Sequence, residues 1–200
     1  MKCDKCHTVQ LKILANLNLI YNNYWYRSGT NNTMINHLNN IAEDIRSRLT
    51  ITTTPIIIDI GCNDGTLLQA FPDMYKIGID PSNIIPIGCD VFINDYFSYK
   101  KIPIKATVIT SIAMFYDLTD PKSFIKDIQK CLDYNGIWIV ELAYLPDILK
   151  DGAYDTICHE HIIYYSLTTF EKLLEGTNLQ IFDVSFNKMN GGSMRLFICH

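Results

Sequence analysis

A short run of branched apolar residues that leads directly into a glycine-rich turn constrains the fold of this chain most. Residues 56–60 are Ile-Ile-Ile-Asp-Ile, and residues 61–65 are Gly-Cys-Asn-Asp-Gly. A continuous β-branched run is typical of a strand buried on both faces. Because a helical pattern begins at Thr66, we expect the strand–turn–helix start of a β-α-β unit.

Strands and helices are predicted to alternate along the rest of the chain. Helices are expected over 33–49, 66–71, 121–132 and 168–175, and strands over 75–79, 91–93, 106–112, 137–142, 179–186 and 194–199. Asn135-Gly136 is predicted to form a turn before its strand, and Asn190-Gly191-Gly192 is predicted to connect the last two strands as a hairpin. The pattern predicts an α/β fold with a doubly wound, mostly parallel sheet and one antiparallel strand at the C-terminal end.

Composition bounds the classes of protein that this chain can belong to. Its 200 residues, 48% hydrophobic and 19% charged, suffice for one packed domain. We expect an N-terminal extension over 1–30 and a main domain over 31–200. The formal net charge of −4, without a cluster of basic residues, disfavours a nucleic-acid partner. Scattered cysteines, with no signal peptide and no long apolar run, predict a reduced, cytoplasmic protein without a membrane partner.

The glycine-rich turn is predicted to hold a nucleotide-type cofactor. Gly61 and Gly65 leave room for a ligand to approach the backbone, and the free N–H groups of the following helix can bind an anionic group. Asp80 ends the next strand, roughly 20 residues farther on, where a carboxylate can accept hydrogen bonds from ribose hydroxyls. NAD is the competing cofactor, but Asn63 occupies the position of the second glycine in its G-x-G-x-x-G turn.

A second segment, residues 154–166, carries the side chains best suited to proton transfer. It contains His159, Glu160 and His161, followed closely by Tyr164 and Tyr165. Because it follows a predicted strand, it is expected at the edge of the sheet where ligands bind. A histidine can accept a proton near neutral pH, and a neighbouring glutamate can orient it. The alternatives are a structural role for the histidines or a zinc site, although the spacing differs from the His-Glu-x-x-His pattern of metalloproteases.

The cofactor segment resembles the first motif of class I methyltransferases that use S-adenosylmethionine (SAM). Residues 78–81, Gly-Ile-Asp-Pro, are similar to the second motif of that family, and the final hairpin matches the ending of its sheet. The resemblance implies a Rossmann-like class I methyltransferase fold with SAM as the cofactor. It implies that Asp95 contacts the adenine; a simple turn at Asp95 is the alternative. The cofactor-binding residues predicted in this way are Asp59, Gly61, Cys62, Asn63, Gly65, Thr66, Asp80, Pro81, Asp95, Tyr96 and Ser111.

The histidine-rich segment is similar to the His-Glu-His-x-x-Tyr-Tyr-Ser signature of sugar C-methyltransferases, which act on nucleotide-linked keto-deoxysugars. That resemblance implies that His161 removes a proton beside a ketone, assisted by Glu160 and His159, and that Tyr24 or Tyr26 also takes part. The family has a tyrosine where this chain has Cys158, so methylation of a sugar hydroxyl is the alternative. Aromatic residues over 21–26 are expected to line the acceptor pocket. The other predicted substrate-binding residues are Tyr164, Tyr165, Asn190, Gly192, Ser193 and Arg195.

The cysteine pair near the N-terminus resembles only half of that family's zinc module. Cys3 and Cys6 supply two ligands where structural zinc takes four, so we expect no bound metal. The family also continues into a further domain, and this chain is expected to be a reduced version or a part of a larger polypeptide, fused to or associated with domains of the same pathway. The expected partner is a sugar or nucleotide-sugar substrate, and a non-catalytic SAM-binding module is the alternative from another class.

Overall fold

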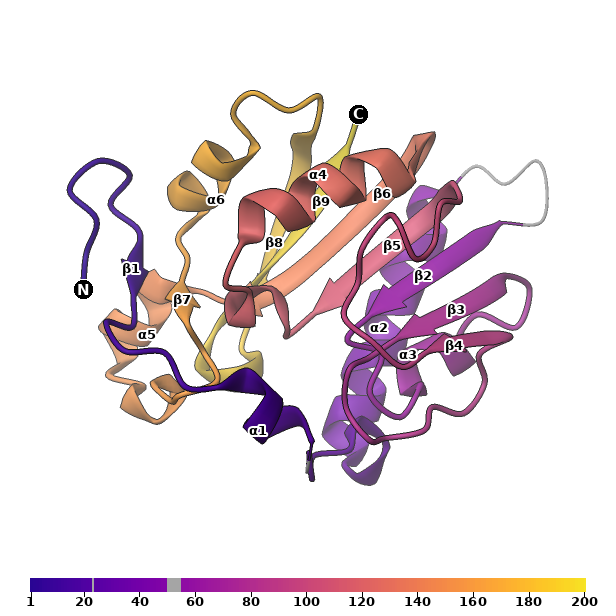
Figure 1. Ribbon diagram of the computed structural model, residues 1–200, viewed down its shortest axis with the longest axis horizontal. Helices are drawn as coiled ribbons and strands as arrows, with labels where there is room; N and C mark the ends of the chain where they lie inside the picture. The colour runs from indigo at the N-terminus through magenta and orange to yellow at the C-terminus, as the bar shows by residue number, and fades with distance from the viewer. Residues whose placement is uncertain (23, 50–54) are drawn as a thin grey trace.

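The computed structural model describes residues 1–22, 24–49 and 55–200 (Figure 1). In these residues seven strands form one sheet in the order β4-β3-β2-β5-β6-β9-β8. The strands are β2 (Ile56–Ile60), β3 (Tyr75–Ile79), β4 (Val91–Ile93), β5 (Ala106–Ile112), β6 (Leu132–Ala143), β8 (Gln180–Asn187) and β9 (Ser193–Cys199). β9 is antiparallel to both of its neighbours, β6 and β8, whereas the pairs among β2 to β6 are parallel. The predicted doubly wound, mostly parallel sheet with an antiparallel strand at its C-terminal end is therefore confirmed.

Helices cover both faces of the sheet (Figure 1). On one face lie α2 (Asn32–Arg48) and α3 (Thr66–Gln69), and on the other lie α4 (Pro121–Cys131) and α6 (Leu167–Leu174). Each pair closes its own apolar core, one built around Ile41 and Phe71 and the other around Trp138 and Phe170. Burying both faces explains why the parallel strands are so rich in isoleucine.

Side-chain caps determine where the helices begin. The side chain of Asn31 accepts a hydrogen bond from the backbone N–H of Thr33 at the start of α2. Asp120 caps α4, in which Pro121 occupies the first turn. Ser166 and Thr169 form a reciprocal capping box at α6. Each cap satisfies a backbone N–H that has no partner within the helix.

The prediction of a turn at Asn135-Gly136 is wrong, because both residues belong to β6. Ala106 pairs with Leu132, and Val108 pairs with Ile137, so the register shifts between these two pairs. The extra residues of β6 are accommodated as an irregularity within the strand. Gly136 suits this place because a Cβ there would lie 2.9 Å from the carbonyl oxygen of Ala106.

The N-terminal segment is tied to the histidine-rich segment. β1 (Val9–Gln10) pairs with β7 (Ile163–Tyr164) in antiparallel fashion, and Leu11 N donates to Ile162 O at 2.9 Å. The short helix α1 (Leu17–Tyr21) then runs below the sheet in Figure 1, while α5 (Leu145–Asp151) follows β6. The predicted division at residue 30 stays a prediction. In the described ranges, no helix has both the length and the apolar composition needed to cross a membrane.

Candidate active site

A cavity of about 530 Å³ lies at the carboxyl ends of the parallel strands, the usual place for ligands in such sheets. Loops after β2, β3, β4 and β5 form one side, and the N-terminal and histidine-rich segments form the other. A volume of this size suits a small organic ligand. The predicted site residues that line this cavity are Tyr24, Tyr26, Asp59, Gly61, Cys62, Asn63, Thr66, Asp80, Pro81, Asp95, Tyr96, Glu160, His161 and Asn190.

The glycine turn has the close-fitting geometry expected of a cofactor cradle. Gly61 has a φ of 77°, and a Cβ on it would lie 3.0 Å from Cγ of Met114 in the cavity wall. Gly65 has a φ of 80°, and its Cβ would lie 2.3 Å from the carbonyl oxygen of Ile87. Both positions therefore exclude other residues by conformation and by space.

Asn63 joins this turn to the N-terminal segment. It adopts a φ of 50°, which asparagine tolerates better than most residues. Its Nδ2 donates to the backbone oxygen of Tyr26 at 2.9 Å, and its Oδ1 accepts from the backbone N–H of Ser28 at 3.0 Å. The aromatic side chains of the N-terminal segment are thereby held against the cofactor turn.

Two carboxyl groups line the cofactor side of the cavity. Asp59 is buried and accepts a hydrogen bond from Oγ1 of Thr110 at 2.6 Å. Burial raises its pKa to about 7, with a smaller contribution from Asp80. The oxygens of Asp80 accept from the backbone N–H groups of Asn63 and Ser82, each at 2.8 Å. These bonds fix the Asp80 carboxylate at the end of β3 and leave lone pairs for ligand hydroxyls.

Asp95 and Tyr96 form the outer rim beyond β4. Asp95 accepts a hydrogen bond from the N–H of Tyr96 at 2.7 Å and pairs with Nζ of Lys101 at 2.5 Å. The hydrogen bond from Lys101 lowers the pKa of Asp95. The ring of Tyr96 lies 6.4 Å from the ring of Tyr21, which brings the rim close to α1.

His161 is oriented by one hydrogen bond and one ring contact. Its Nδ1 lies 2.8 Å from the backbone oxygen of Thr156. A carbonyl oxygen only accepts, so the hydrogen belongs to Nδ1 and the neutral ring has its free lone pair on Nε2. The ring packs against Tyr116 at 4.2 Å between centroids. The arrangement presents a proton acceptor in a side chain that lines the cavity.

Glu160 lies on the same side of the cavity and interacts with the N-terminal tyrosines. Burial raises the pKa of Tyr24, and the charge and hydrogen bond of Glu160 raise it further. Tyr21 contacts Tyr24, with 5.6 Å between ring centroids. Glu160 and the tyrosines at positions 21 and 24 therefore belong to the same lining of the cavity.

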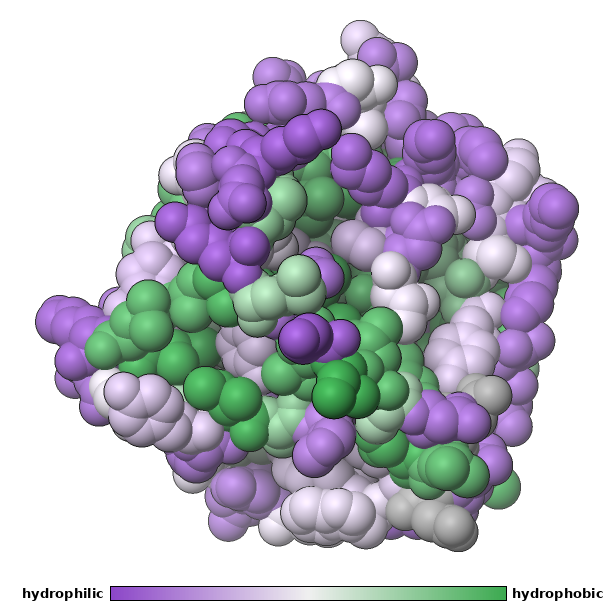
Figure 2. Space-filling model, turned by 60° about the vertical axis from the view of Figure 1, so that its left-hand side comes forward, coloured by the Kyte–Doolittle hydropathy of each residue, from purple (hydrophilic) through white to green (hydrophobic). Residues whose placement is uncertain are grey.

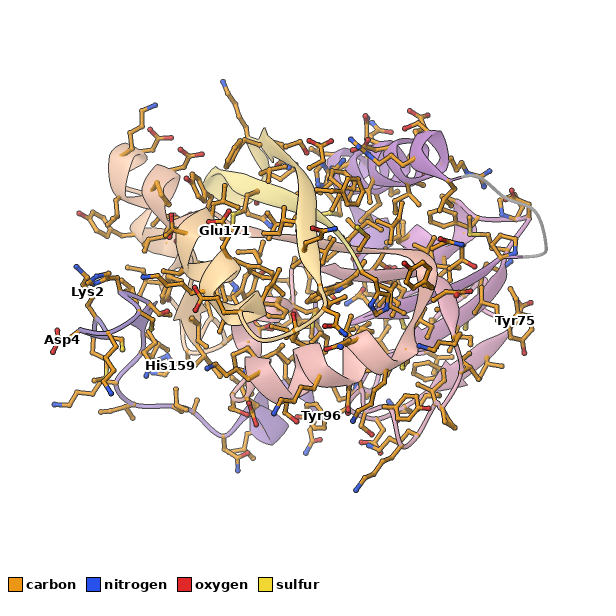
Figure 3. All side chains as sticks on the ribbon, turned by 90° about the horizontal axis from the view of Figure 1, so that it is seen from above. Lys2, Asp4, Tyr75, Tyr96, His159 and Glu171 are labelled. Atoms are coloured by element: carbon orange, nitrogen blue, oxygen red, sulfur yellow. The ribbon has the colours of Figure 1, made fainter. Side chains whose placement is uncertain are left out.

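Several predicted site residues lie outside the lining of this cavity. His159 is exposed, and Figure 3 places it at the same end of the molecule as Lys2 and Asp4. Ser111 accepts a hydrogen bond from Nε1 of Trp138 in the core. The remaining predicted residues in this group are Gly65, Tyr164, Tyr165, Gly192, Ser193 and Arg195.

Arg195 has a structural environment instead. It is buried, and its Nε donates to Glu141 at 2.7 Å while its Nη1 pairs with Asp44 at 3.0 Å. Glu141 is the direct cross-strand partner of Arg195, and it also contacts His37 of α2. These charged groups connect the end of the sheet to α2.

Sequence reasoning missed Asp117 and Tyr116, which both line the cavity. They belong to the 3₁₀ turn η2 (Phe115–Asp117) after β5. Their position after a parallel strand was the available signal.

The cysteine pair lies away from this cavity. Cys6 Sγ is 3.1 Å from Oγ1 of Thr8, and both Cys3 and Cys6 are free thiols. Within the described residues, no group of three or more His, Cys, Asp or Glu side chains is arranged to hold a metal ion. Zinc binding by this pair stays untested.

Comparison with known proteins assigns the family. Residues 34–184 match the family model described as a methyltransferase domain. The C-methyltransferase NovU of Streptomyces niveus is 23% identical over 209 residues, which cover 98% of this chain and 49% of NovU. The chain thus spans about half the length of this curated relative.

Solved structures share the fold at low sequence identity. Magnesium protoporphyrin IX methyltransferase from Synechocystis PCC 6803 with bound SAH has a TM-score of 0.62 at 11% identity and covers 91% of each chain. The plantazolicin methyltransferase BpumL in complex with SAH has a TM-score of 0.60 at 16% identity, over 82% of this chain and 83% of that one. These structures, both with bound SAH, share the predicted Rossmann-like methyltransferase fold. The chain belongs to the methyltransferase-domain family.

Proposed function

We propose that this chain transfers a methyl group from SAM to a sugar, namely a nucleotide-linked keto-deoxysugar, with His161 as the general base. The observation that carries the proposal is the position of His161. Its ring lines the same cavity as the glycine turn, and its Nδ1 is bound to Thr156 O, which leaves Nε2 free to accept a proton. The similarity to NovU supports carbon as the methylated atom.

The residues of the cofactor side fit SAM. The turn at Gly61 and the N–H groups that follow it suit the methionine part, and the carboxylate of Asp80 suits the ribose hydroxyls. Asp95 and Tyr96 line the cavity beyond the end of β4 and suit contact with the adenine. When bound, SAM supplies an electrophilic methyl group attached to a sulfonium.

His161 performs the proton transfer in this mechanism. Its Nε2 accepts the proton from the carbon beside the acceptor ketone, and the electron pair of that C–H bond moves toward the ketone oxygen. The hydrogen bond from Nδ1 to Thr156 keeps the ring in one orientation during the transfer. Glu160 lines the same cavity as Tyr24 and helps to hold the acceptor.

Product analysis tests the proposal. The chain is incubated with SAM and a panel of nucleotide-linked sugars, half with a ketone and half fully hydroxylated, and the products are analysed by mass spectrometry and NMR. We expect a new carbon-bound methyl signal from a keto-deoxysugar only. An oxygen-bound methyl group in the product would show that the chain is an O-methyltransferase and would contradict the proposed C-methylation. No methylation of any sugar, with SAM bound, would overturn the sugar assignment.

A further inference from the structure

A buried carboxyl group faces the acceptor side of the cavity, and the mechanism above does not use it. Asp117 lines the cavity with only 6% of its surface exposed. Its Oδ2 accepts a hydrogen bond from the hydroxyl of Tyr21 at 3.1 Å. Its Oδ1 makes no hydrogen bond to any described residue. A buried polar atom without a partner is costly, so this oxygen is the natural place for a ligand to bind.

The backbone holds Asp117 next to the general base. The carbonyl oxygen of Tyr116 accepts a hydrogen bond from the N–H of Ile162 at 3.0 Å, and the Tyr116 ring packs against the His161 ring. Asp117 follows Tyr116 in the chain, and His161 precedes Ile162. The backbone hydrogen bond between Tyr116 and Ile162 therefore holds the two chain segments together. Both side chains also line the cavity, so a ligand bound there can contact the two together.

The surroundings of Asp117 favour a neutral carboxyl group. No Lys, Arg or His side chain forms an ion pair with it among the described residues. Burial raises the pKa of Asp117 well above its ordinary value, and the negative charge of Glu160 raises it further. A protonated carboxyl group is a hydrogen-bond donor. Because Oδ2 already accepts from Tyr21, the proton is available on Oδ1.

We propose that Asp117 is a catalytic residue that donates a hydrogen bond from Oδ1 to the ketone oxygen of the acceptor sugar. This inference rests on the proposed function and adds the group that stabilises negative charge on the acceptor. Tyr21 is the positioning residue that holds the Asp117 carboxyl group in this orientation.

The step balances within the acceptor and two side chains. The C–H bond beside the ketone breaks, and its proton goes to Nε2 of His161. The electron pair forms the new C=C bond while the former C=O pair localises on the oxygen as an enolate. Asp117 keeps its proton and stabilises the enolate through a hydrogen bond. A preorganised donor at a developing oxyanion contributes on the order of 10²–10³ in rate.

Hydrogen exchange at the acceptor carbon tests this inference without methyl transfer. A keto-deoxysugar nucleotide is incubated in D₂O with the chain and SAH, and deuterium incorporation is followed by NMR. Asp117→Asn keeps a neutral donor of nearly the same shape, so we expect its exchange rate to lie well above that of Asp117→Ala. Asp117→Ala removes the donor, so we expect exchange to slow roughly 10²-fold, with SAH affinity unchanged.

A double variant guards against misfolding. Asp117→Leu combined with Tyr21→Phe removes both partners of the hydrogen bond and leaves no unpaired hydroxyl, and we expect the same loss as in Asp117→Ala. A wild-type exchange rate in Asp117→Ala or in the folded double variant would overturn the role of Asp117 but not the proposed function. Loss of exchange in Asp117→Asn, with its melting temperature unchanged, would also overturn it, because an anion would then be required. Absence of exchange and of methylation in the wild-type chain would overturn the proposed function and this inference with it.

Discussion

Nε of Arg195 donates a hydrogen bond to Oε2 of Glu141 at 2.7 Å, and both side chains are buried. The pair sits between β6 and β9 and continues to Asp44 of α2. Removing one partner of a buried ion pair leaves the other charge uncompensated, which costs about 3–5 kcal/mol. We therefore predict that Arg195→Met lowers the free energy of unfolding by this order. Chemical denaturation measures the change, and the KM for the sugar should stay the same. A raised KM for the sugar with an unchanged free energy of unfolding would instead indicate that Arg195 binds the substrate.

The matched pair Gly65 and Gly176 separates backbone strain from steric overlap. Their φ angles are 80° and 81°, but a Cβ on Gly65 would lie 2.3 Å from Ile87 O, whereas one on Gly176 would meet nothing within 4 Å. We predict that Gly176→Ala costs about 1 kcal/mol from the positive φ. Gly65→Ala should cost clearly more and weaken SAM binding. Thermal unfolding of both variants checks the difference, and equal losses would contradict the steric account.

Asp80 and Asp95 offer a second comparison, between a buried and an exposed carboxylate on the cofactor side. Hydrogen bonds to charged groups contribute about 1.5–3 kcal/mol, so we predict that Asp80→Ala weakens SAM binding by roughly 10- to 100-fold. Asp95→Asn should weaken it less, because Asp95 is exposed and already paired with Lys101. Isothermal titration with SAM measures both. A larger loss of SAM affinity at Asp95 would contradict the role of Asp80 as the main cofactor-binding carboxylate.

The buried carboxyl group of Asp59 makes stability depend on pH. Its pKa is raised to about 7 in the folded chain, against about 3.9 in an unfolded one. Between these two values the folded chain retains a proton that the unfolded chain has lost, so stability falls as pH rises from about 4 to about 7. We predict that Asp59→Asn, which cannot ionise, has a flatter dependence over this range.

Chemical denaturation at a series of pH values gives the free energy of unfolding of the wild type and of Asp59→Asn. The measurement is the difference between the two proteins in how this free energy changes with pH. Other groups titrate in the same range and cancel in this difference. If the wild type gained stability relative to the variant as pH rose, Asp59 would have to be ionised and stabilised by a partner.

The parts of the fold that the sequence predicts best are those with a strong local signal. The apolar run of β2, the glycine turn and Asp80 after β3 follow directly from residue type and spacing, and they lie where the prediction placed them. The irregularity in β6 was missed because Asn-Gly is also the commonest signal of a hairpin turn. Only pairing with β5 distinguishes the two structures.

Predicting the site from sequence was harder because tertiary contacts decide which way a side chain faces. Asp117 follows β5 in a 3₁₀ turn, and nothing local indicates that an aspartate there is buried beside Tyr21. Arg195 lies in a segment that resembles a substrate loop, yet strand register directs it toward Glu141. In both cases a partner distant in sequence determines the role of the charged residue.

The N-terminal segment carries an apolar surface that sequence patterning did not predict. Ile13, Leu19 and Trp25 each expose more than two thirds of their surface. Figure 2, turned to bring this side of the molecule forward, shows apolar residues gathered in a band across the face. The helical and strand periods that locate buried residues are absent over such short elements, so the exposed positions could not be distinguished beforehand.

Replacement of the two histidines of the His-Glu-His segment tests the central claim most directly. His161 lines the cavity, whereas His159 is exposed at the periphery (Figure 3), so His159→Asn is the matched control for His161→Asn. The measurement is the single-turnover rate of methyl transfer with SAM saturating, alongside SAM affinity by titration. We predict that His161→Asn slows transfer by about 10²–10⁴-fold with unchanged SAM affinity, while His159→Asn keeps the wild-type rate. A wild-type rate in His161→Asn would contradict the account.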